Sequence, residues 1–272
     1  MKAGGHQDRF GKTGANIPWT ENSMIWHTVT INGIAVEAGY SERAVNEIFA
    51  PLLEKLTEKQ RAAGRRILVM LAAPPGAGKS TLVSFLHRLA EERRDAGRIQ
   101  AIGMDGFHRR QEYLLTHDTE RDGKKIRMVE IKGAPETFDL EALTKRVKSL
   151  AAGEETKWPV YDRLLHNPVE DAVRIDGDIV LLEGNYLLLD RDGWRDLPSF
   201  ADYTISVRAD EDLLRKRLVD RRIKTGVGEE AAVRFVDFSD MPNARLCLSC
   251  SMRADLQLEI DEQGDYRMIR GK

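Results

Sequence analysis

The chain has 272 residues, 42% hydrophobic and 32% charged, which fits a folded globular protein and excludes collagen-like and disordered classes. Its 42 basic and 44 acidic residues leave a net charge of -2, so no overall field favours nucleic acid or a membrane surface as partner. Cys247 and Cys250 are too few for a secreted disulfide framework or a four-ligand zinc site. Because no apolar run approaches the length of a membrane span and the start lacks a signal-peptide pattern, we expect a cytoplasmic protein.

The first elements expected along the chain are a tail and a β-hairpin. Residues 1–22 are rich in glycine and polar side chains, so we expect a flexible tail. Residues 25–36 alternate apolar and polar side chains around Asn32-Gly33, the strongest short signal for a two-residue hairpin turn. A hairpin should therefore open the fold.

A helix should follow the hairpin. Between residues 41 and 63 the apolar side chains recur at helical spacing, and Pro51 predicts an interruption or a bend. We treat residues 23–64 as an N-terminal hairpin and helix.

The remainder, residues 65–272, shows the alternation of apolar runs and amphipathic helices that is typical of a mostly parallel sheet covered by helices. The last segment alternates around Gln263-Gly264 and predicts a second hairpin, which could pair with the first. The other expected elements are a strand over 67–73, a helix over 81–94, a strand ending at Asp105, a polar loop to Lys125, a helix from Phe138 or Asp139, strands from Ile179 and Tyr203, and a basic helix over 211–224.

The strongest chemical signal is APPGAGKST, from Ala73 to Thr81, which follows an apolar strand and precedes an amphipathic helix. This setting is typical of a Walker A loop, whose backbone N–H groups surround phosphate oxygens at a helix N-terminus. Lys79 would reach the β- and γ-phosphates of ATP, and Ser80 would bind Mg²⁺. Ala73 replaces the usual first glycine, which limits backbone freedom there. We predict nucleotide contacts from Pro75, Gly76, Ala77, Gly78, Lys79, Ser80 and Thr81. The motif and the alternation together predict a three-layer α/β/α P-loop NTPase fold.

Two carboxylates are expected at the same sheet edge as this loop. Asp105, in the segment MDGFH, is placed to accept a proton from an acceptor hydroxyl, although an aspartate before Gly106 also suits a plain turn. Glu183 ends the apolar strand IVLLEG, where acids are rare, and is placed to hold Mg²⁺ or its water shell. A structural salt bridge is the alternative for Glu183.

A cluster of basic residues lies on the helix and turn from 213 to 228. A solvated basic face is the ordinary explanation of such a run. In a phosphoryl-transfer enzyme, arginines on a lid stabilise charge on the transferring oxygens and exclude water. We predict a lid near 213–228, with Arg217 and Arg221 as its catalytic cations because they lie four residues apart on one helix face.

Five segments together resemble the superfamily of phosphoribulokinase, uridine kinase and pantothenate kinase. They are APPGAGKST, MDGFH, GAPETFD, WPVYDRLLHNPV and LLEGNYLLL, in that order. The sequences GAPETFD, VYDR and LLEGNY are most similar to those of the nucleoside/nucleotide kinase-like branch, which includes proposed fructose (sugar) kinases. The resemblance covers residues 65–254.

The resemblance implies ATP as phosphoryl donor, Asp105 as base and Glu183 near Mg²⁺. It also implies that Asn243, in the segment DMPNARL, lies near the adenine. Taken alone, His108 and Tyr161 are as consistent with packing as with ligand binding. The acceptor pocket that the resemblance implies is lined by His108, Phe138, Tyr161, Asp162 and Arg163.

We therefore predict an ATP-dependent small-molecule kinase that phosphorylates a hydroxyl of a sugar such as fructose, with uridine or another nucleoside, or pantothenate, as alternatives. A P-loop NTPase regulator without acceptor phosphorylation is a hypothesis of a different class, although no guanine-reading NKxD segment is present. We expect a small-molecule partner and no nucleic acid or membrane. The residues leave open the acceptor, a homodimer and the role of the terminal hairpins.

Overall fold

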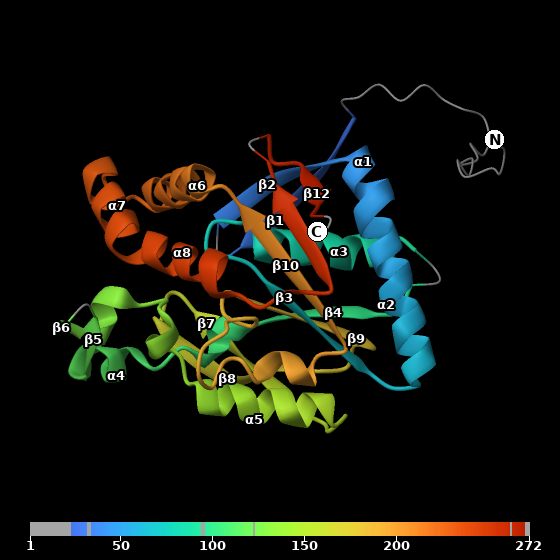
Figure 1. The fold of residues 1–272 in the computed structure, drawn as a ribbon, viewed down its shortest axis with the longest axis horizontal. Coiled ribbons are helices and arrows are strands. Elements are labelled where there is room, and N and C mark those ends of the chain that lie inside the picture. Colours follow the sequence, from blue (N-terminus) through green and yellow to red (C-terminus); the bar gives the residue numbers. More distant parts are fainter. Residues whose placement is uncertain (1–22, 32–33, 94–95, 122, 262, 270–272) are drawn as a thin grey trace, which may run out of the picture.

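A computed structural model of the chain contains a central six-stranded sheet between two layers of helices (Figure 1). All of its strands are parallel except the last, which confirms the predicted mostly parallel α/β/α fold. The predicted tail over 1–22 and the turn at Asn32-Gly33 lie outside the described residues. The structure describes residues 23–31, 34–93, 96–121, 123–261 and 263–269. The sheet has the order β12-β11-β10-β3-β9-β4, with β3 (Ile67–Ala72), β4 (Ile99–Gly103), β9 (Ile179–Gly184), β10 (Tyr203–Ala209), β11 (Leu256–Ile260) and β12 (Tyr266–Met268).

The centre of the sheet forms from β3 and β9, which are apolar because helices cover both of their faces. Every residue of β3 is buried, and its alternate side chains enter two separate hydrophobic clusters. One cluster contains side chains of α2 (Ala50–Ala63) and α3 (Lys79–Glu91), and the other contains those of α5 (Leu140–Ala151). Figure 1 shows α3 and α5 on opposite sides of the sheet.

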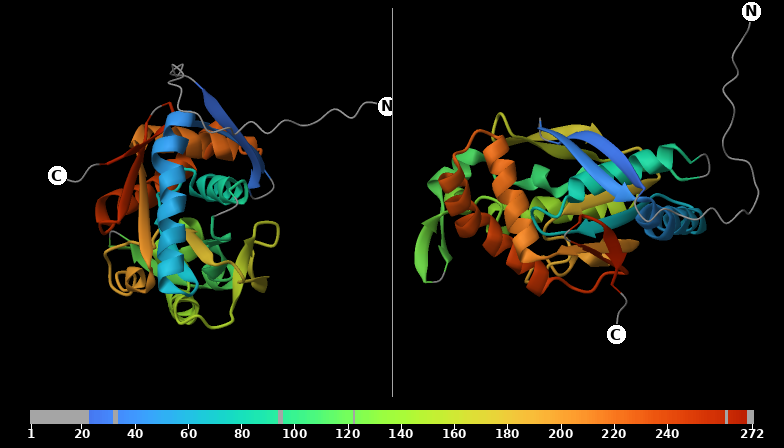
Figure 2. Two further views of the ribbon diagram at one scale, coloured as in Figure 1. Left: turned by 90° about the vertical axis from the view of Figure 1, so that its right-hand side faces the viewer. Right: turned by 90° about the horizontal axis from the view of Figure 1, so that it is seen from above.

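The predicted N-terminal hairpin is present as β1 (Met24–Ile31) and β2 (Ile34–Ser41), and it lies along α3 (Figure 2). Tyr40 is buried and stacks on Phe85 of α3, with ring centroids 3.9 Å apart. His27 also reaches α3, where Nε2 lies 3.0 Å from Ser84 Oγ. Since Tyr40 and Phe85 belong to the main hydrophobic cluster, the hairpin packs on the same core as the sheet.

The following helix has the interruption predicted from Pro51. It begins as α1 (Glu42–Ala44), where the Ser41 hydroxyl accepts a hydrogen bond from the Ala44 N–H. A π-helical turn, Val45–Phe49, then precedes α2. Proline lacks an N–H and crowds the preceding turn, so a wider turn just before it removes the conflict.

The predicted C-terminal hairpin is confirmed, since β11 and β12 pair antiparallel. The suggested pairing with the N-terminal hairpin is wrong: β11 joins β10 in the central sheet, and β1–β2 form a separate sheet. Among the described residues the two hairpins meet through side chains and turns, because parallel pairing with β10 satisfies the backbone of β11. Ser41 Oγ donates to Asp265 Oδ1 at 2.6 Å, and the rings of Tyr40 and Tyr266 stack at 5.9 Å.

Residues 104–174 differ most from expectation. The strand before Asp105 ends at Gly103, and Asp105 lies in a 3₁₀ turn, Met104–Phe107. The expected polar loop to Lys125 contains α4 and a small hairpin, and a second hairpin follows α5. These elements are α4 (Gln111–Thr116), β5 (Asp118–Arg121), β6 (Lys124–Arg127), 3₁₀ turns at Met128–Ile131 and Pro135–Thr137, β7 (Lys157–Asp162) and β8 (Asn167–Arg174).

The predicted basic helix is α6 (Glu211–Lys224), with the expected bounds. A 3₁₀ turn, Leu197–Phe200, precedes β10. The chain then continues through α7 (Glu229–Phe235), a π-helical turn at Val236–Asp240, and α8 (Met241–Cys250). Figure 1 shows α6, α7 and α8 beyond the carboxyl end of β10.

Candidate active site at the phosphate-binding loop

The APPGAGKST segment forms the expected turn between β3 and α3. Gly76 and Gly78 have φ angles of 86° and 78°, which a residue with a side chain rarely adopts. Gly78 is the N-cap of α3 and supplies no side-chain acceptor, so the first N–H groups of the helix lack the usual cap. Such free N–H groups at a helix N-terminus attract phosphate oxygens.

Ala73 does not disturb this loop. Its N–H donates to the Gly184 carbonyl at 3.2 Å, and its side chain is buried. Among described residues with a side chain, only His166 and Asp171 have a positive φ, so the backbone at Ala73 suits any residue. The expected restriction from a missing glycine therefore has no structural consequence here.

Ser80 and Glu183 meet directly. Ser80 Oγ donates to Glu183 Oε1 at 2.7 Å, which brings a hydroxyl from the start of α3 to a carboxylate at the end of β9. Burial raises the pKa of Glu183, and the negative charge of Asp105 adds to this, while Lys79 and the Ser80 hydrogen bond oppose it. One hydroxyl and one carboxylate suit Mg²⁺, which takes few protein ligands and completes its shell with phosphate and water. Within the described ranges, no cluster of three or more His, Cys, Asp and Glu side chains forms an all-protein metal site.

Asp105 lies next to this pair. Burial alone would raise its pKa, but His108, Lys79, Arg163 and Arg221 outweigh this and hold the pKa below its ordinary value. Both carboxylates keep some solvent access although protein surrounds them, as expected for groups at the bottom of an open cleft. Asp105 is therefore ionised at neutral pH and can accept a proton.

Local packing fixes the turn that carries Asp105. A side chain on Gly106 would meet the backbone of β7, because an added Cβ would lie 2.1 Å from the Pro159 oxygen. The indole Nε1 of Trp158 donates to the Gly103 carbonyl at 2.8 Å. Glycine is thus required in MDGFH by the close approach of β7.

His108, Phe138 and Tyr161 form an aromatic group beside Asp105. The His108 ring lies 3.9 Å from the Phe138 ring and 5.1 Å from that of Tyr161, between centroids. His108 Nδ1 is 2.9 Å from the Asp105 carbonyl oxygen, and burial lowers the pKa of His108. Phe138 is buried and supports the other two, whereas His108 and Tyr161 keep some solvent access.

Asp162 and Arg163 follow Tyr161 at the tip of the β7–β8 hairpin. Asp162 Oδ1 accepts the N–H groups of Leu164 and Leu165, so this carboxylate shapes the turn. Arg163 is exposed and forms no hydrogen bond or ion pair with any side chain in the described part of the chain. Its charge nevertheless acts on Asp105 and His108, so Arg163 lies within electrostatic range of the site.

Arg217 and Arg221 point to different places, although both belong to α6. Arg221 acts on Asp105 and Arg163, at the acidic centre. Arg217 Nη2 lies 3.4 Å from where a Cβ on Gly264 would be, toward the C-terminal hairpin. Helix α6 passes over the phosphate loop, since an added Cβ on Gly76 would lie 3.1 Å from the Leu214 oxygen and 3.1 Å from Leu218 Cγ.

The predicted lid is fastened to the rest of the molecule. Leu214 and Leu218 of α6 are fully buried. Arg222 pairs with Asp240 at 3.0 Å, and its guanidinium lies 3.5 Å from the centre of the Phe235 ring. Helices α6, α7 and α8 therefore form one packed unit.

Asn243 lies on α8, close to the segment GAPETFD. Its Nδ2 is 3.8 Å from the Cβ position of Gly133, the first residue of GAPETFD, and its buried Oδ1 has no partner. Cys247, one turn further along α8, donates its thiol to the Asn185 carbonyl. These contacts put Asn243 beside the segment GAPETFD, and its predicted contact with the adenine stays a prediction.

The structure also adds Lys132, which the motifs did not indicate. Lys132 Nζ donates to Gln111 Oε1 at 2.7 Å and lies 5.0 Å from the centre of the Tyr161 ring. Burial lowers the pKa of Lys132, and Arg163 lowers it further. Its position immediately before GAPETFD was the one available sequence signal.

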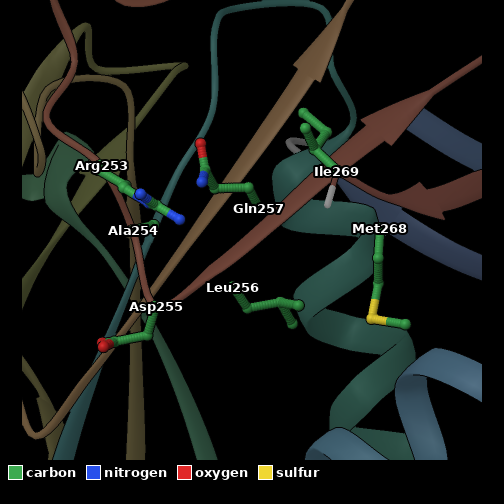
Figure 3. A pocket seen from close by; sticks show the side chains of 7 residues that line it. All are labelled: Arg253, Ala254, Asp255, Leu256, Gln257, Met268 and Ile269. Atoms are coloured by element: carbon green, nitrogen blue, oxygen red, sulfur yellow. The ribbon is translucent and has the colours of Figure 1, made fainter. Parts of the chain in front are cut away.

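Two adjoining cavities lie behind the phosphate loop. One, of about 540 Å³, is lined by Ala73, Pro74 and Arg208 among others. The other, of about 530 Å³, is shown in Figure 3, where the side chains of Arg253 and Gln257 point toward each other above β11. Neither is lined by Asp105 or Glu183, so the acidic centre lies outside both cavities.

A parallel sheet, a phosphate loop at its carboxyl edge and a hydroxyl–carboxylate pair beside it are the features of a P-loop nucleotide-binding protein. Residues 68–260 match the phosphoribulokinase / uridine kinase family. The chain belongs to that family of P-loop small-molecule kinases.

Individual relatives agree with this. The chain is 39% identical to the protein named YggC of Escherichia coli over 88% of its own length and 97% of that protein. It is 29% identical to "Putative uridine kinase C227.14" of Schizosaccharomyces pombe, over 79% of this chain and 89% of that one. A solved structure, the "putative fructose transport system kinase" from Silicibacter sp. TM1040, superposes with a TM-score of 0.68 at 32% identity, covering 77% of this chain and 98% of that chain. In the described part, no helix is both long and apolar enough to cross a membrane.

Proposed function

We propose that the chain is a kinase that transfers the γ-phosphoryl group of ATP to a hydroxyl of a small metabolite, with a fructose-like sugar as the first candidate. The main support for this proposal is the hydrogen bond from Ser80 to Glu183, beside an ionised Asp105. A regulator that only senses nucleotide has no need of a base at this point. The likeness to a protein named for fructose transport supports a sugar, while the uridine kinase name supports a nucleoside; pantothenate is the third candidate.

Each residue has a role in this proposal. The loop from Pro75 to Thr81 binds the phosphates through backbone N–H groups, and Lys79 and Arg221 neutralise charge on the transferring oxygens. Ser80 and Glu183 would hold Mg²⁺, which when bound offsets the negative charge of the phosphates. Arg217 stays a prediction, and its position near Gly264 favours a contact away from the transferring group.

The transfer itself needs one base. Asp105 accepts the proton of the acceptor hydroxyl as its oxygen bonds to the γ-phosphorus. The bond from that phosphorus to the β,γ-bridging oxygen breaks, and ADP leaves. His108, Phe138 and Tyr161 would line the acceptor side, with Asp162 and Arg163 on the hairpin above. Asn243 stays a candidate for contact with the adenine.

The test is ADP release with Mg²⁺ and ATP across fructose, uridine and pantothenate. The proposal predicts stimulation of turnover at least about 100-fold over ATP hydrolysis by one of these acceptor classes. Turnover on a nucleoside alone would discard the sugar assignment. Hydrolysis that no hydroxyl compound stimulates would favour the nucleotide-sensing regulator. Cytoplasmic location and a homodimer stay predictions.

A further inference from the structure

The two adjoining cavities behind the phosphate loop form one groove to which the proposed reaction gives no role. They share three lining residues, Arg253, Gln257 and Ile269. Their volumes, about 540 and 530 Å³, are typical of small-molecule sites, which measure roughly 300–1,000 Å³. The groove is therefore large enough for a ligand of its own.

Backbone hydrogen bonds hold two walls of this groove in place. After α8, the Met252 N–H donates to the Leu188 carbonyl at 2.7 Å. On the strand side, the Ile269 N–H donates to the Gln257 carbonyl at 2.8 Å. A ligand would thus enter a site whose backbone is already fixed, which lowers the entropic cost of binding.

The polar side chains of the groove come from one face of β10 and β11. Ile205 and Val207 of β10 pack in the hydrophobic cluster that contains α3 and α6. Because successive side chains of a strand point to opposite faces, Ser206 and Arg208 lie on the other face. Ser206 is in register with Gln257 of β11. A hydroxyl, an amide and a guanidinium group therefore line the same cavity.

Two arginines in this groove lack an acidic partner. Arg208 and Arg253 both line the cavity of about 540 Å³, and within the described ranges neither side chain forms a hydrogen bond or an ion pair. Figure 3 shows the Arg253 side chain directed toward Gln257 above β11. The Gln257 amide nitrogen is also a donor, so three side chains that can donate hydrogen bonds line one space.

The acids of the neighbouring strands do not compensate these charges. Asp255 Oδ2 accepts hydrogen bonds from the N–H and the hydroxyl of Thr204, both at 2.8 Å. Glu259 is in register with Arg208, but its Oε2 accepts from Arg267 Nε at 2.8 Å. Two guanidinium groups without a counterion in one concave site attract an anion.

The rest of the cavity wall is largely apolar. Pro74, Leu248, Met252 and Ile269 all line the cavity of about 540 Å³. A bare inorganic ion would leave this surface in contact with water, whereas a ligand with a compact apolar body would cover it.

We infer that this groove binds a small molecule that combines an oxyanion, a phosphate ester or a carboxylate, with a compact apolar body. The planar guanidinium groups of Arg208 and Arg253 suit either oxyanion. No residue of 76–81 lines the groove, and neither Asp105 nor Glu183 does. Its ligand is therefore neither the phosphate tail of the nucleotide nor the acceptor of the proposed transfer.

Ligand-observed NMR with three probes tests the site: phenyl phosphate, benzoate and the neutral benzyl alcohol. Mg²⁺ and a non-hydrolysable ATP analogue saturate the phosphate loop throughout. At least one anion should bind with a Kd of about 5 mM or tighter, and benzyl alcohol at least about tenfold more weakly. The two anions distinguish a phosphate site from a carboxylate site. Absence of binding by both anions, or equal binding of the alcohol, would refute the inference.

Variants assign the binding to residues. Arg208→Gln and Arg253→Gln should each weaken binding of the preferred anion about tenfold or more. Arg174→Gln is the matched control and should bind as the wild type does. The Arg174 side chain is 75% exposed, and its carbonyl accepts from Gln100 of β4, at the other edge of the sheet. Unchanged binding in both groove variants would place the anion elsewhere and contradict the inference.

The ATP analogue separates this groove from the nucleotide site. Its affinity should stay within about twofold of the wild-type value in Arg208→Gln and Arg253→Gln, because neither change touches the phosphate loop. Raising its concentration should not displace the bound anion. Displacement would show that the groove is part of the nucleotide site and overturn the inference. These measurements need no turnover, so their outcome is independent of whether any acceptor is phosphorylated.

Discussion

Replacement of Asp105 by asparagine separates catalysis from binding more cleanly than any other change in the cleft. The Asp105 side chain makes no hydrogen bond to another described residue, and only its main-chain carbonyl is engaged, by His108. Asparagine has nearly the same shape, so the Asp105→Asn variant loses no internal hydrogen bond and its free energy of unfolding should change by less than about 1 kcal/mol.

The catalytic loss should be much larger. A positioned base contributes about 10²- to 10⁴-fold to a rate, so the barrier should rise by roughly 3–5 kcal/mol. Affinity for ATP should stay the same or increase, because the change removes a negative charge beside Lys79 and Arg221.

The assays are steady-state kinetics, calorimetric binding of a non-hydrolysable ATP analogue, and thermal unfolding. Asp192→Asn, at a fully exposed aspartate, is the control and should behave as the wild type. An equal loss of analogue binding and turnover in Asp105→Asn, with the fold intact, would show that Asp105 holds the nucleotide and is not the base.

Three further predictions concern the turn, the metal site and the N-terminal hairpin. Gly106→Ala should lower the free energy of unfolding, measured by chemical denaturation, by about 2 kcal/mol or more, because rigid backbone of β7 fills the space of the new Cβ. The control Gly228→Ala has open space around the new Cβ and should lower it by no more than about 1 kcal/mol. Burial raises the pKa of Glu183 above its ordinary 4.5, and Mg²⁺ binds the ionised carboxylate. The Mg²⁺ affinity, measured by calorimetry at a saturating concentration of an ATP analogue, should therefore increase as the pH rises through this pKa. The Glu183→Gln variant should lose this pH dependence. Tyr40→Ala should lower the free energy of unfolding by about 3–5 kcal/mol, because Tyr40 is buried and stacks on Phe85 of α3. The control Trp26→Ala, at a side chain that is 58% exposed, should lower it by less than about 1 kcal/mol. Similar losses in the two variants would mean that the hairpin does not depend on its stacking against α3.

The sequence predicted the elements that have a strong period or a strong motif. Strands β3 and β9 are largely apolar runs, and Asp210 is the N-cap residue of α6, so the type and position of these elements could be predicted. The phosphate loop was readable because spacing alone specifies it. The structure around Asp105 was harder to predict, since the turn that carries Asp105 depends on the packing of β7 against Gly106.

The hairpins β5–β6 and β7–β8 were missed for a physical reason. Neither has a fully buried face: Val160 is 44% exposed, and Leu164 at the tip is 94% exposed. Alternation is a weak signal where burial does not enforce it. The dipeptide Asp122-Gly123 was the available turn signal for β5–β6.

The two arginines of α6 show the limit of a helical-spacing argument. Four residues put Arg217 and Arg221 on one face of the helix, as predicted. The helix crosses the phosphate loop, however, so a shift of one turn moves a long side chain from the Gly264 turn to Asp105. Lys132 was not predicted, because its contact with Tyr161 joins residues far apart in the sequence and no local pattern encodes such a contact.

The opposite pKa shifts of Asp105 and Glu183 follow from their neighbours and divide the chemistry between them. Both carboxylates are surrounded by protein, and burial favours the neutral form of each. His108 and the cations Lys79, Arg163 and Arg221 reverse this effect for Asp105, whereas Glu183 has Lys79 and the Ser80 hydroxyl to oppose it. Paired acids whose environments separate their pKa values take different roles. Asp105 is thus ready to accept a proton, whereas Glu183 gains most from a cation beside it, which fits the base to one and the metal to the other.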